Sequence, residues 1–372
     1  MRLIKELSIR NFTVFSRADI CLSPALNVFI GENGAGKTHL LKLLYAPVAA
    51  CAGAARGKGI PPTKALLQRE VADKLVGVFR PEALGRLTRR KSGRERCDVG
   101  LVFQQKEQNL AFSFSSNSKS EVVIETLPGI WESSMPVFLP TRELMSLYPN
   151  FVAVYEHHYL EFEETWRDTC IHLGAAVRRG PKDKKTARLL KGLSDAMEGS
   201  IELNKNGRFY LRTSTGRMEM PLVAEGLRKV ACLAHLAGTG VFLDRGCLFW
   251  DEPEANLNPA LLRQIAETLL LLCKDGIQVF LATHSLFLLR ELEIRLADRE
   301  FASLERAFFG LRKNQGGVEV LQSDSIDGVG DIAALDEELM QSERYMDMLD
   351  DESVTKGRTP DVRSTRRERK DA

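Results

Sequence analysis

No stretch of the sequence approaches the roughly 18 consecutive apolar residues that a membrane-spanning helix requires. The first residues, MRLIKELSIRNF, carry charges where a secretory signal would need an uninterrupted apolar segment. The sequence therefore predicts a protein that is neither secreted nor membrane-spanning, and we expect a cytoplasmic location.

Cysteine does not occur in any arrangement typical of a zinc site or a disulfide framework. The cysteines are odd in number, widely spaced and without a C-x-x-C pair: Cys21, Cys51, Cys97, Cys170, Cys232, Cys247 and Cys273. Such a set suits a reducing compartment, in agreement with the expected cytoplasmic location.

Net charge is nearly absent as well, since 52 Lys and Arg residues face 50 Asp and Glu residues, which gives +2. This balance leaves no electrostatic footprint for nucleic acid over the whole molecule, so any such contact must come from local patches. Hydrophobic residues make up 44% of the 372 positions, and the length exceeds that of one usual core. We expect one large domain with an insertion, or two domains.

What the sequence does contain is a phosphate-binding loop. Residues 31–38, GENGAGKT, match the pattern G-x-x-x-x-G-K-[ST], in which backbone N–H groups surround an anion and the lysine reaches the outer phosphates. The segment before the loop predicts a buried strand and the segment after it a helix, whose N-terminus favours a phosphate. The alternative is a glycine turn that happens to precede a lysine. The expected nucleotide-binding residues are Gly31, Glu32, Asn33, Gly34, Ala35, Gly36, Lys37 and Thr38.

Two later strand ends carry further polar residues. The segment CLFWDEPEANLNP ends a predicted buried strand with Asp251 and Glu252. We expect Asp251 to bind Mg²⁺ together with Thr38, and Glu252 to act as the general base. The alternative is an acidic turn before Pro253. Another apolar run ends in THS, where His284 could donate a hydrogen bond to a γ-phosphate, although most lone histidines are structural or merely exposed.

The pattern along the chain predicts an α/β protein with five segments. Residues 1–60 would form an N-terminal lobe with the phosphate loop, and residues 61–220 an inserted region of helices and antiparallel strands. Residues 221–330 would supply the C-terminal lobe with the acidic motif and the THS strand end. A helix over residues 331–350 and a disordered tail over residues 351–372 would follow.

The segments LSIRNFTVF, GENGAGKT, LFWDEPEANLNP and THS together resemble the ABC-type ATPases of the SMC, RecF and OLD branch, over most of the chain. The resemblance implies a P-loop NTPase with an ABC/SMC-like head, an antiparallel β subdomain and a mixed helical insertion. In that family two heads enclose two ATP molecules, and a signature segment of the partner completes each site. The implied cofactors are therefore ATP and Mg²⁺, and the implied assembly is a homodimer.

The resemblance also implies roles for single residues. These roles are phosphate binding for Lys37, Mg²⁺ binding for Thr38 and Asp251, general-base catalysis for Glu252 and γ-phosphate sensing for His284. The segment from Glu254 to Asn258 would be the loop that contacts the partner head.

The signature segment is where the sequence departs from the family. The corresponding place reads VAEGLRKVACLAHL, with Ala224 where the family usually has serine. Gly226 and free N–H groups at the helix start could still face a partner's phosphate, so Gly226 is included among the nucleotide-binding candidates. The alternative is an ordinary amphipathic helix that starts after Pro221.

Three functions remain in competition. We favour a stand-alone ATP-binding and ATP-hydrolysing switch that regulates a separate effector protein, in DNA maintenance or phage defence by analogy with similar ATPases. The ATPase subunit of an ABC transporter would share the head but usually has a fuller signature. A non-hydrolysing ATP-dependent scaffold is the remaining alternative. A complete OLD nuclease would need a further metal-binding domain, for which we expect no room after the last strands.

Two basic stretches could contact a nucleic-acid backbone. They are Arg89–Arg96, RRKSGRER, and Arg178–Lys185, RRGPKDKK. The alternative is that both are solvated surface loops, as is common for such runs.

Overall fold

The computed structural model describes residues 3–58, 61–89, 93–131, 134–158, 160–178, 180, 182–242, 246–330 and 333–356. Most of the predicted tail, residues 357–372, lies outside this range. Helix α9 (Ala333–Lys356) continues beyond residue 350, where the sequence predicted the C-terminal helix to end.

The central element is a sheet of six strands. Their order is β14 (Gly317–Ser323), β13 (Arg306–Asn314), β3 (Leu26–Gly31), β12 (Gln278–Thr283), β11 (Cys247–Asp251) and β7 (Val137–Leu139). The five strands from β13 to β7 run parallel, and only β14 is antiparallel. The carboxyl ends of β3, β11 and β12 therefore lie side by side at one edge, which is where parallel α/β sheets place their ligands.

Helices cover both faces of this sheet. Every residue of β3, β11 and β12 is buried, as the continuous apolar runs in the sequence predicted. On one face Phe249 stacks on Phe280 with ring centroids 4.7 Å apart, and Leu40 and Leu44 of helix α1 (Lys37–Lys58) belong to the same apolar cluster. On the other face Val279 packs in a cluster that includes residues of α6 (Glu225–Thr239), α7 (Pro259–Lys274) and α8 (Leu286–Ala297). Alternate side chains of each strand thus serve two separate cores.

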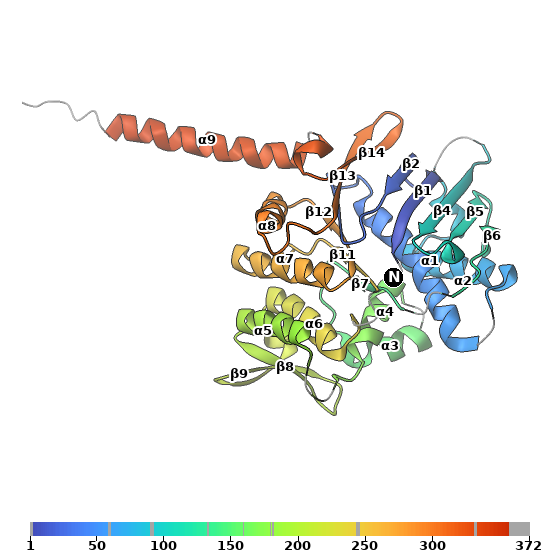
Figure 1. Ribbon diagram of the computed structural model, residues 1–372, viewed down its shortest axis with the longest axis horizontal. Helices are drawn as coiled ribbons and strands as arrows, with labels where there is room; N and C mark the ends of the chain where they lie inside the picture. Colours follow the sequence, from blue (N-terminus) through green and yellow to red (C-terminus); the bar gives the residue numbers. More distant parts are fainter. Residues whose placement is uncertain are drawn as a thin grey trace, which may run out of the picture.

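The remaining strands form two antiparallel sheets. One has the order β2 (Phe15–Cys21), β1 (Ile4–Phe12), β4 (Arg96–Phe103), β5 (Leu110–Ser115) and β6 (Val123–Thr126), and the other has the order β10 (Gly216–Glu219), β9 (Phe209–Thr213) and β8 (Gly199–Leu203). The first sheet lies with α1 and α2 (Lys64–Phe79) on one side of the central sheet, and the helices from α5 (Lys184–Met197) to α8 lie on the other (Figure 1). The region predicted as an insertion thus supplies strands to all three sheets.

The other helices complete the two sides. Their bounds are α2 (Lys64–Phe79), α3 (Tyr148–His157), α4 (Glu164–Leu173), α5 (Lys184–Met197), α6 (Glu225–Thr239), α7 (Pro259–Lys274) and α8 (Leu286–Ala297), with short 3₁₀ turns at Leu84–Leu87, Lys106–Gln108, Met220–Leu222 and Asp327–Val329. One described helix, α1 over Lys37–Arg56, is long and apolar enough to cross a membrane, but 78% of that stretch is buried, as in a core helix.

Candidate functional site

The GENGAGKT loop, residues 31–38, connects β3 to α1, as the sequence predicted. Gly34 and Gly36 have φ angles of +76° and +92°, in the left-handed region that side chains rarely adopt. At Gly36 a Cβ atom would also lie 2.7 Å from Val14 and 2.8 Å from Phe15. Glycine is therefore required at Gly36 both by the backbone and by the space around it.

Lys37 is the first residue of α1 and is only 5% exposed. Its Nζ donates hydrogen bonds to the carbonyl oxygens of Gly31 at 2.7 Å and Glu32 at 3.2 Å, so the ammonium group lies inside the curve of the loop. Burial lowers the pKa of Lys37, and the nearby carboxylates of Glu252 and Asp251 oppose this shift. The loop thus holds a buried ammonium group, and carbonyl oxygens of the loop accept its hydrogen bonds.

Thr38 and Asp251 come together from elements far apart in the sequence. The Thr38 hydroxyl lies 3.0 Å and 2.9 Å from the two carboxylate oxygens of Asp251 and donates to them. Burial raises the pKa of Asp251 to about 6, although the hydrogen bond from Thr38 acts in the opposite direction. A hydroxyl and a carboxylate at this distance form the hard oxygen donor set that suits Mg²⁺, so the residues fit the ion that the sequence predicted.

Replacing Asp251 with asparagine is expected to raise the stability of the metal-free, nucleotide-free protein. The pKa of Asp251 is about 6 in the folded protein and 3.8 without the protein environment, so Asp251 lowers the stability of the fold as the pH rises above 3.8, and this loss is complete above about pH 6. At about pH 7 the gain should reach up to about 3 kcal/mol, and it should shrink as the pH falls towards about 4. Thermal melting of both proteins at the two pH values measures the difference. A variant that melts at a lower temperature than the parent at both pH values would show that the ionised Asp251 carboxylate does not destabilise the fold.

Glu252 and His284 meet at the ends of neighbouring strands. Oε1 of Glu252 lies 3.3 Å from Nδ1 of His284, and both side chains are partly exposed. Glu252 has a φ angle of +46°, which is rare for a residue with a side chain, and its N–H donates to the carbonyl of Ala282 at 2.9 Å. The tight turn after β11 therefore brings the Glu252 carboxylate beside the His284 ring.

Glu254 lies inside the site, although the sequence suggested that its segment contacts a partner. Its Oε1 accepts hydrogen bonds from the Thr283 hydroxyl at 2.7 Å and from the N–H of His284 at 3.1 Å. Its other carboxylate oxygen, Oε2, is buried and has no hydrogen-bond donor among the described residues. Glu254 thus fastens the loop after β11 to the end of β12 and retains one free acceptor.

Lys229 is a further site residue that the sequence did not indicate. It lies on α6 and is buried, and its Nζ donates to the carbonyl of Ala255 at 2.7 Å and of Glu252 at 3.4 Å. Burial lowers its pKa to about 8, while Glu254 and other acidic groups nearby favour the charged form. Lys229 therefore holds the backbone of the loop that carries Glu252. The sequence showed only that Lys229 lies in a helical pattern, because the residue that it contacts, Ala255, lies 26 positions further along the chain.

Gly226 lies in the first turn of α6 and is buried against its own chain. A Cβ atom there would lie 2.5 Å from the carbonyl oxygen of Asn256. The N-cap residue, Ala224, makes no side-chain hydrogen bond to the helix. The described contact of Gly226 is thus with the loop after β11, and a substitution here would disturb that loop directly.

Replacing Gly226 with alanine is expected to destabilise the protein by about 1–3 kcal/mol, because the new methyl group overlaps the Asn256 carbonyl. Gly53→Ala is the matched control, since a Cβ atom at this position of α1 would meet no atom of the described residues within 4 Å. That control should be neutral or stabilising. Chemical unfolding of both variants measures the difference in stability. Equal stabilities would show that the loop after β11 moves to accommodate the methyl group at no cost in free energy.

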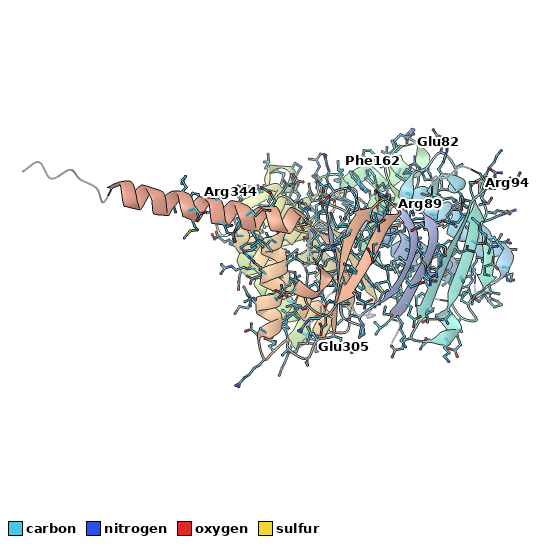
Figure 2. All side chains as sticks on the ribbon, turned by 90° about the horizontal axis from the view of Figure 1, so that it is seen from above. Glu82, Arg89, Arg94, Phe162, Glu305 and Arg344 are labelled. Atoms are coloured by element: carbon cyan, nitrogen blue, oxygen red, sulfur yellow. The ribbon has the colours of Figure 1, made fainter. Side chains whose placement is uncertain are left out.

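The basic stretches are described only in part. Residues 90–92, 179 and 181 lie outside the described residues. The side chain of Arg94 is exposed at the end of the molecule away from α9 (Figure 2). Arg96 forms ion pairs with Asp98 at 2.8 Å and Glu125 at 2.7 Å, and Lys185 pairs with Asp275 at 2.9 Å. These pairs reduce the positive charge that the described part of each stretch offers to a phosphate backbone.

Two family profiles match the chain. Residues 101–290 match the family described as "AAA domain, putative AbiEii toxin, Type IV TA system", and residues 1–47 match the family described as "AAA ATPase domain". The first match spans about half of the chain.

Relatives of known function match a short segment only. The DNA replication and repair protein RecF of Streptococcus uberis is 52% identical over 42 residues, which is 11% of this chain and 12% of that protein. RecF of Renibacterium salmoninarum is 46% identical over 41 residues, which is 11% of this chain and 10% of the relative. The chain thus aligns with only about a tenth of the length of either protein.

Solved structures share the fold over nearly the whole chain. The Smc head domain of Pyrococcus furiosus with an extended coiled coil, bound to the C-terminal domain of ScpA, covers 92% of this chain and 100% of its own, with 12% identity and a TM-score of 0.51. An SmcHead bound to the C-winged helix domain of ScpA covers 87% of this chain and 98% of its own, also at 12% and 0.51. The predicted P-loop fold with an SMC-like head is confirmed. The chain belongs to the AAA-domain family that matches half of its length, and its fold is similar to that of the SMC heads.

Proposed function

We propose that the chain binds ATP with Mg²⁺ and hydrolyses it at the edge formed by the carboxyl ends of β3, β11 and β12. The observation that carries this proposal is the meeting of Lys37, the Thr38–Asp251 pair and the Glu252–His284 pair at that edge. These groups come from residues up to 247 positions apart, and they match the parts that phosphoryl transfer to water requires.

The phosphates would lie in the loop that Lys37 now fills. Its ammonium group can exchange the carbonyl oxygens of Gly31 and Glu32 for phosphate oxygens, which are stronger acceptors. The N-terminus of α1 adds free N–H groups and the positive end of its dipole. Thr38 and Asp251 would hold Mg²⁺, which supplies positive charge to the phosphate oxygens when it is bound.

Glu252 would accept the proton of the attacking water. Its carboxylate is partly exposed at the edge of the sheet, and the buried Lys229 holds its backbone in place. His284 lies beside it and can donate a hydrogen bond to the γ-phosphate as negative charge develops there. Glu254 keeps the two strand ends together through Thr283 and the His284 backbone.

The base and ribose would occupy a groove beside the loop. This groove has a volume of about 630 Å³, and its lining includes Gly34, His39, Phe79, Arg86 and Arg89. The rings of His39 and Phe79 meet edge to face with centroids 5.7 Å apart, which leaves an aromatic wall for a planar base. The groove continues directly from the phosphate loop, and this supports a whole nucleotide as the ligand.

The cycle of binding and hydrolysis would serve as a switch. Two heads would enclose two ATP molecules, with the N-terminus of α6 near Gly226 and the loop from Glu254 to Asn258 at the contact. The Smc head structures carry a bound domain of ScpA, which supports a protein partner for this chain too. We propose a separate effector protein, with a role in DNA maintenance or phage defence in the cytoplasm.

The test is an assay of phosphate release by the purified chain with Mg²⁺ and with a chelator in its place. We expect slow release that needs Mg²⁺, together with an ATP-dependent rise in melting temperature. A repeat with DNA present tests the proposed role in DNA maintenance. Binding without release would favour the non-hydrolysing scaffold, and the absence of both would overturn the proposal.

A further inference from the structure

Helix α9 extends away from the rest of the molecule. Figures 1 and 2 show it, with Arg344 on its side, reaching past the helices next to it with no other element around its outer part. Its 24 residues correspond to a length of about 36 Å at the usual rise per residue. The described side chains of α9 are exposed, so this part of the helix gains little stability from packing, which is the main source of helix stability in proteins.

The exposed part of α9 nevertheless carries large apolar side chains. Leu339, Tyr345, Met346 and Leu349 lie within about one third of the helix circumference, at the spacing of 3, 4 and 7 residues that marks a binding face. All four are exposed, and Met346 is 57% exposed. This face, which we call the α9 stripe, is therefore an unpartnered apolar surface in the described part of the chain.

Strong negative charge accompanies the α9 stripe. The helix sequence contains eight acidic residues and two basic ones. Glu343 lies beside the stripe and has no ion-pair partner among the described residues, whereas Glu337 pairs with Arg344 at 3.0 Å. Two such helices would repel one another if they paired directly, so the surface that covers the stripe must be apolar and positively charged.

Helix α8 offers a surface of this chemistry. Phe287, Arg290 and Ile294 all lie on its exposed face, and Ile294 is 61% exposed. Arg290 stands between the two apolar residues and has no ion-pair partner among the described residues. Phe287 and Ile294 are seven residues apart, which is two helical turns. This is also the spacing of Leu339 and Met346 on α9.

We propose that the α9 stripe of one copy packs on α8 of a second copy, and that the exchange is mutual. With Leu339 and Met346 against Phe287 and Ile294, Arg290 falls level with residue 342 or 343, depending on whether the helices run parallel or antiparallel. In either direction its long side chain can reach Glu343. Each surface thus supplies the apolar contacts and the charge that the other lacks.

The start of α9 makes a mutual exchange geometrically natural. The turn before it is tied to α8 of the same chain, because the N–H of Ile326 donates to Oε1 of Glu293 at 3.2 Å. Each copy therefore presents its α8 surface near the base of its own outgoing α9. A two-fold axis between two copies would let each α9 reach the α8 of the other, with the same contact made twice.

The test measures molar mass by light scattering over a wide concentration range, with nucleotide absent. Under these conditions the outcome is separate from the ATP-dependent contact of the proposed function, and neither failure implies the other. We expect the parent chain to dimerise and Met346→Lys to weaken dimerisation at least about tenfold. Met348→Lys is the matched control, because Met348 is 47% exposed on the opposite side of the same helix. It should dimerise like the parent.

A charge exchange tests the partner surface. Arg290→Glu and Glu343→Arg should each weaken the dimer, and the double variant should recover a large part of the loss. Circular dichroism and ATP binding check that each variant is folded. A parent that stays monomeric, equal effects of Met346→Lys and Met348→Lys, or a double variant no better than the single ones would overturn the proposal. If the parent stays monomeric, the α9 stripe would instead be a binding surface for a different protein.

Discussion

Lys37→Ala is expected to abolish ATP binding, with no bound nucleotide detectable by equilibrium dialysis at concentrations that saturate the parent. The Lys37 ammonium is buried inside the loop and is held there by the carbonyl groups of Gly31 and Glu32. Without it, a triphosphate would lie next to the carboxylates of Asp251 and Glu252 with no buried ammonium inside the loop to offset their repulsion. The N–H groups of the loop are neutral, so they cannot replace the charge-assisted hydrogen bond that the Lys37 ammonium would donate to a phosphate.

Lys313→Ala is the matched control for this variant. Lys313 also donates to the phosphate loop, since its Nζ lies 2.7 Å from the carbonyl of Asn33, but its side chain is exposed. Solvent screening makes an exposed charge worth little, so we expect affinity to fall only a few-fold. If Lys37→Ala binds ATP as the parent does, the assignment of the loop to phosphate is wrong.

Glu252→Gln is expected to bind ATP and to lose turnover by a factor of about 10²–10⁴, the usual contribution of a general base. Glutamine keeps the size of the side chain and an acceptor oxygen, but it cannot take a proton from water. The backbone at φ +46° is fixed by contacts that the substitution does not touch, namely the N–H bond to Ala282 and the Lys229 contact with the carbonyl. Single-turnover phosphate release measures the loss directly.

Two controls accompany the Glu252→Gln measurement. The melting temperature with and without ATP should rise as in the parent, which separates lost chemistry from lost folding. Light scattering with ATP present should show whether the unhydrolysed nucleotide favours a dimer of heads. Unchanged turnover would remove Glu252 from its role, and an unchanged mass would count against the enclosed pair of nucleotides.

The residues proposed to bind phosphate and Mg²⁺ could be selected from the sequence because each follows a recognisable strand. A buried apolar run before GENGAGKT, before Asp251 and before His284 indicates three parallel strands, and their carboxyl ends must meet in one sheet. Lys229 could not be predicted in the same way. A lysine in an amphipathic helix is usually exposed, and only the close approach of α6 to the loop after β11 makes this one a buried donor.

The path of the chain between the motifs was less readable. Strands β4, β5 and β6 join β1 and β2 in one sheet, and β7 enters the central sheet beside β11. The sequence pattern gives the period of each strand, but pairing between strands that lie far apart in the chain depends on packing that the period does not encode. The position of Glu254 was missed for a related reason, since its orientation follows from the tight turn at Glu252.

The order of strands in the central sheet also limits when the chain can fold during synthesis. Strand β3 lies between β12 and β13, and both of these partners are made roughly 250 or more residues after it. At the usual rate of about 5–20 residues per second, the strand that carries the phosphate loop waits roughly 10–50 s with both edges unpaired. Such a strand is a template for wrong pairing, so newly made chains should depend on chaperones until residue 314 has left the ribosome.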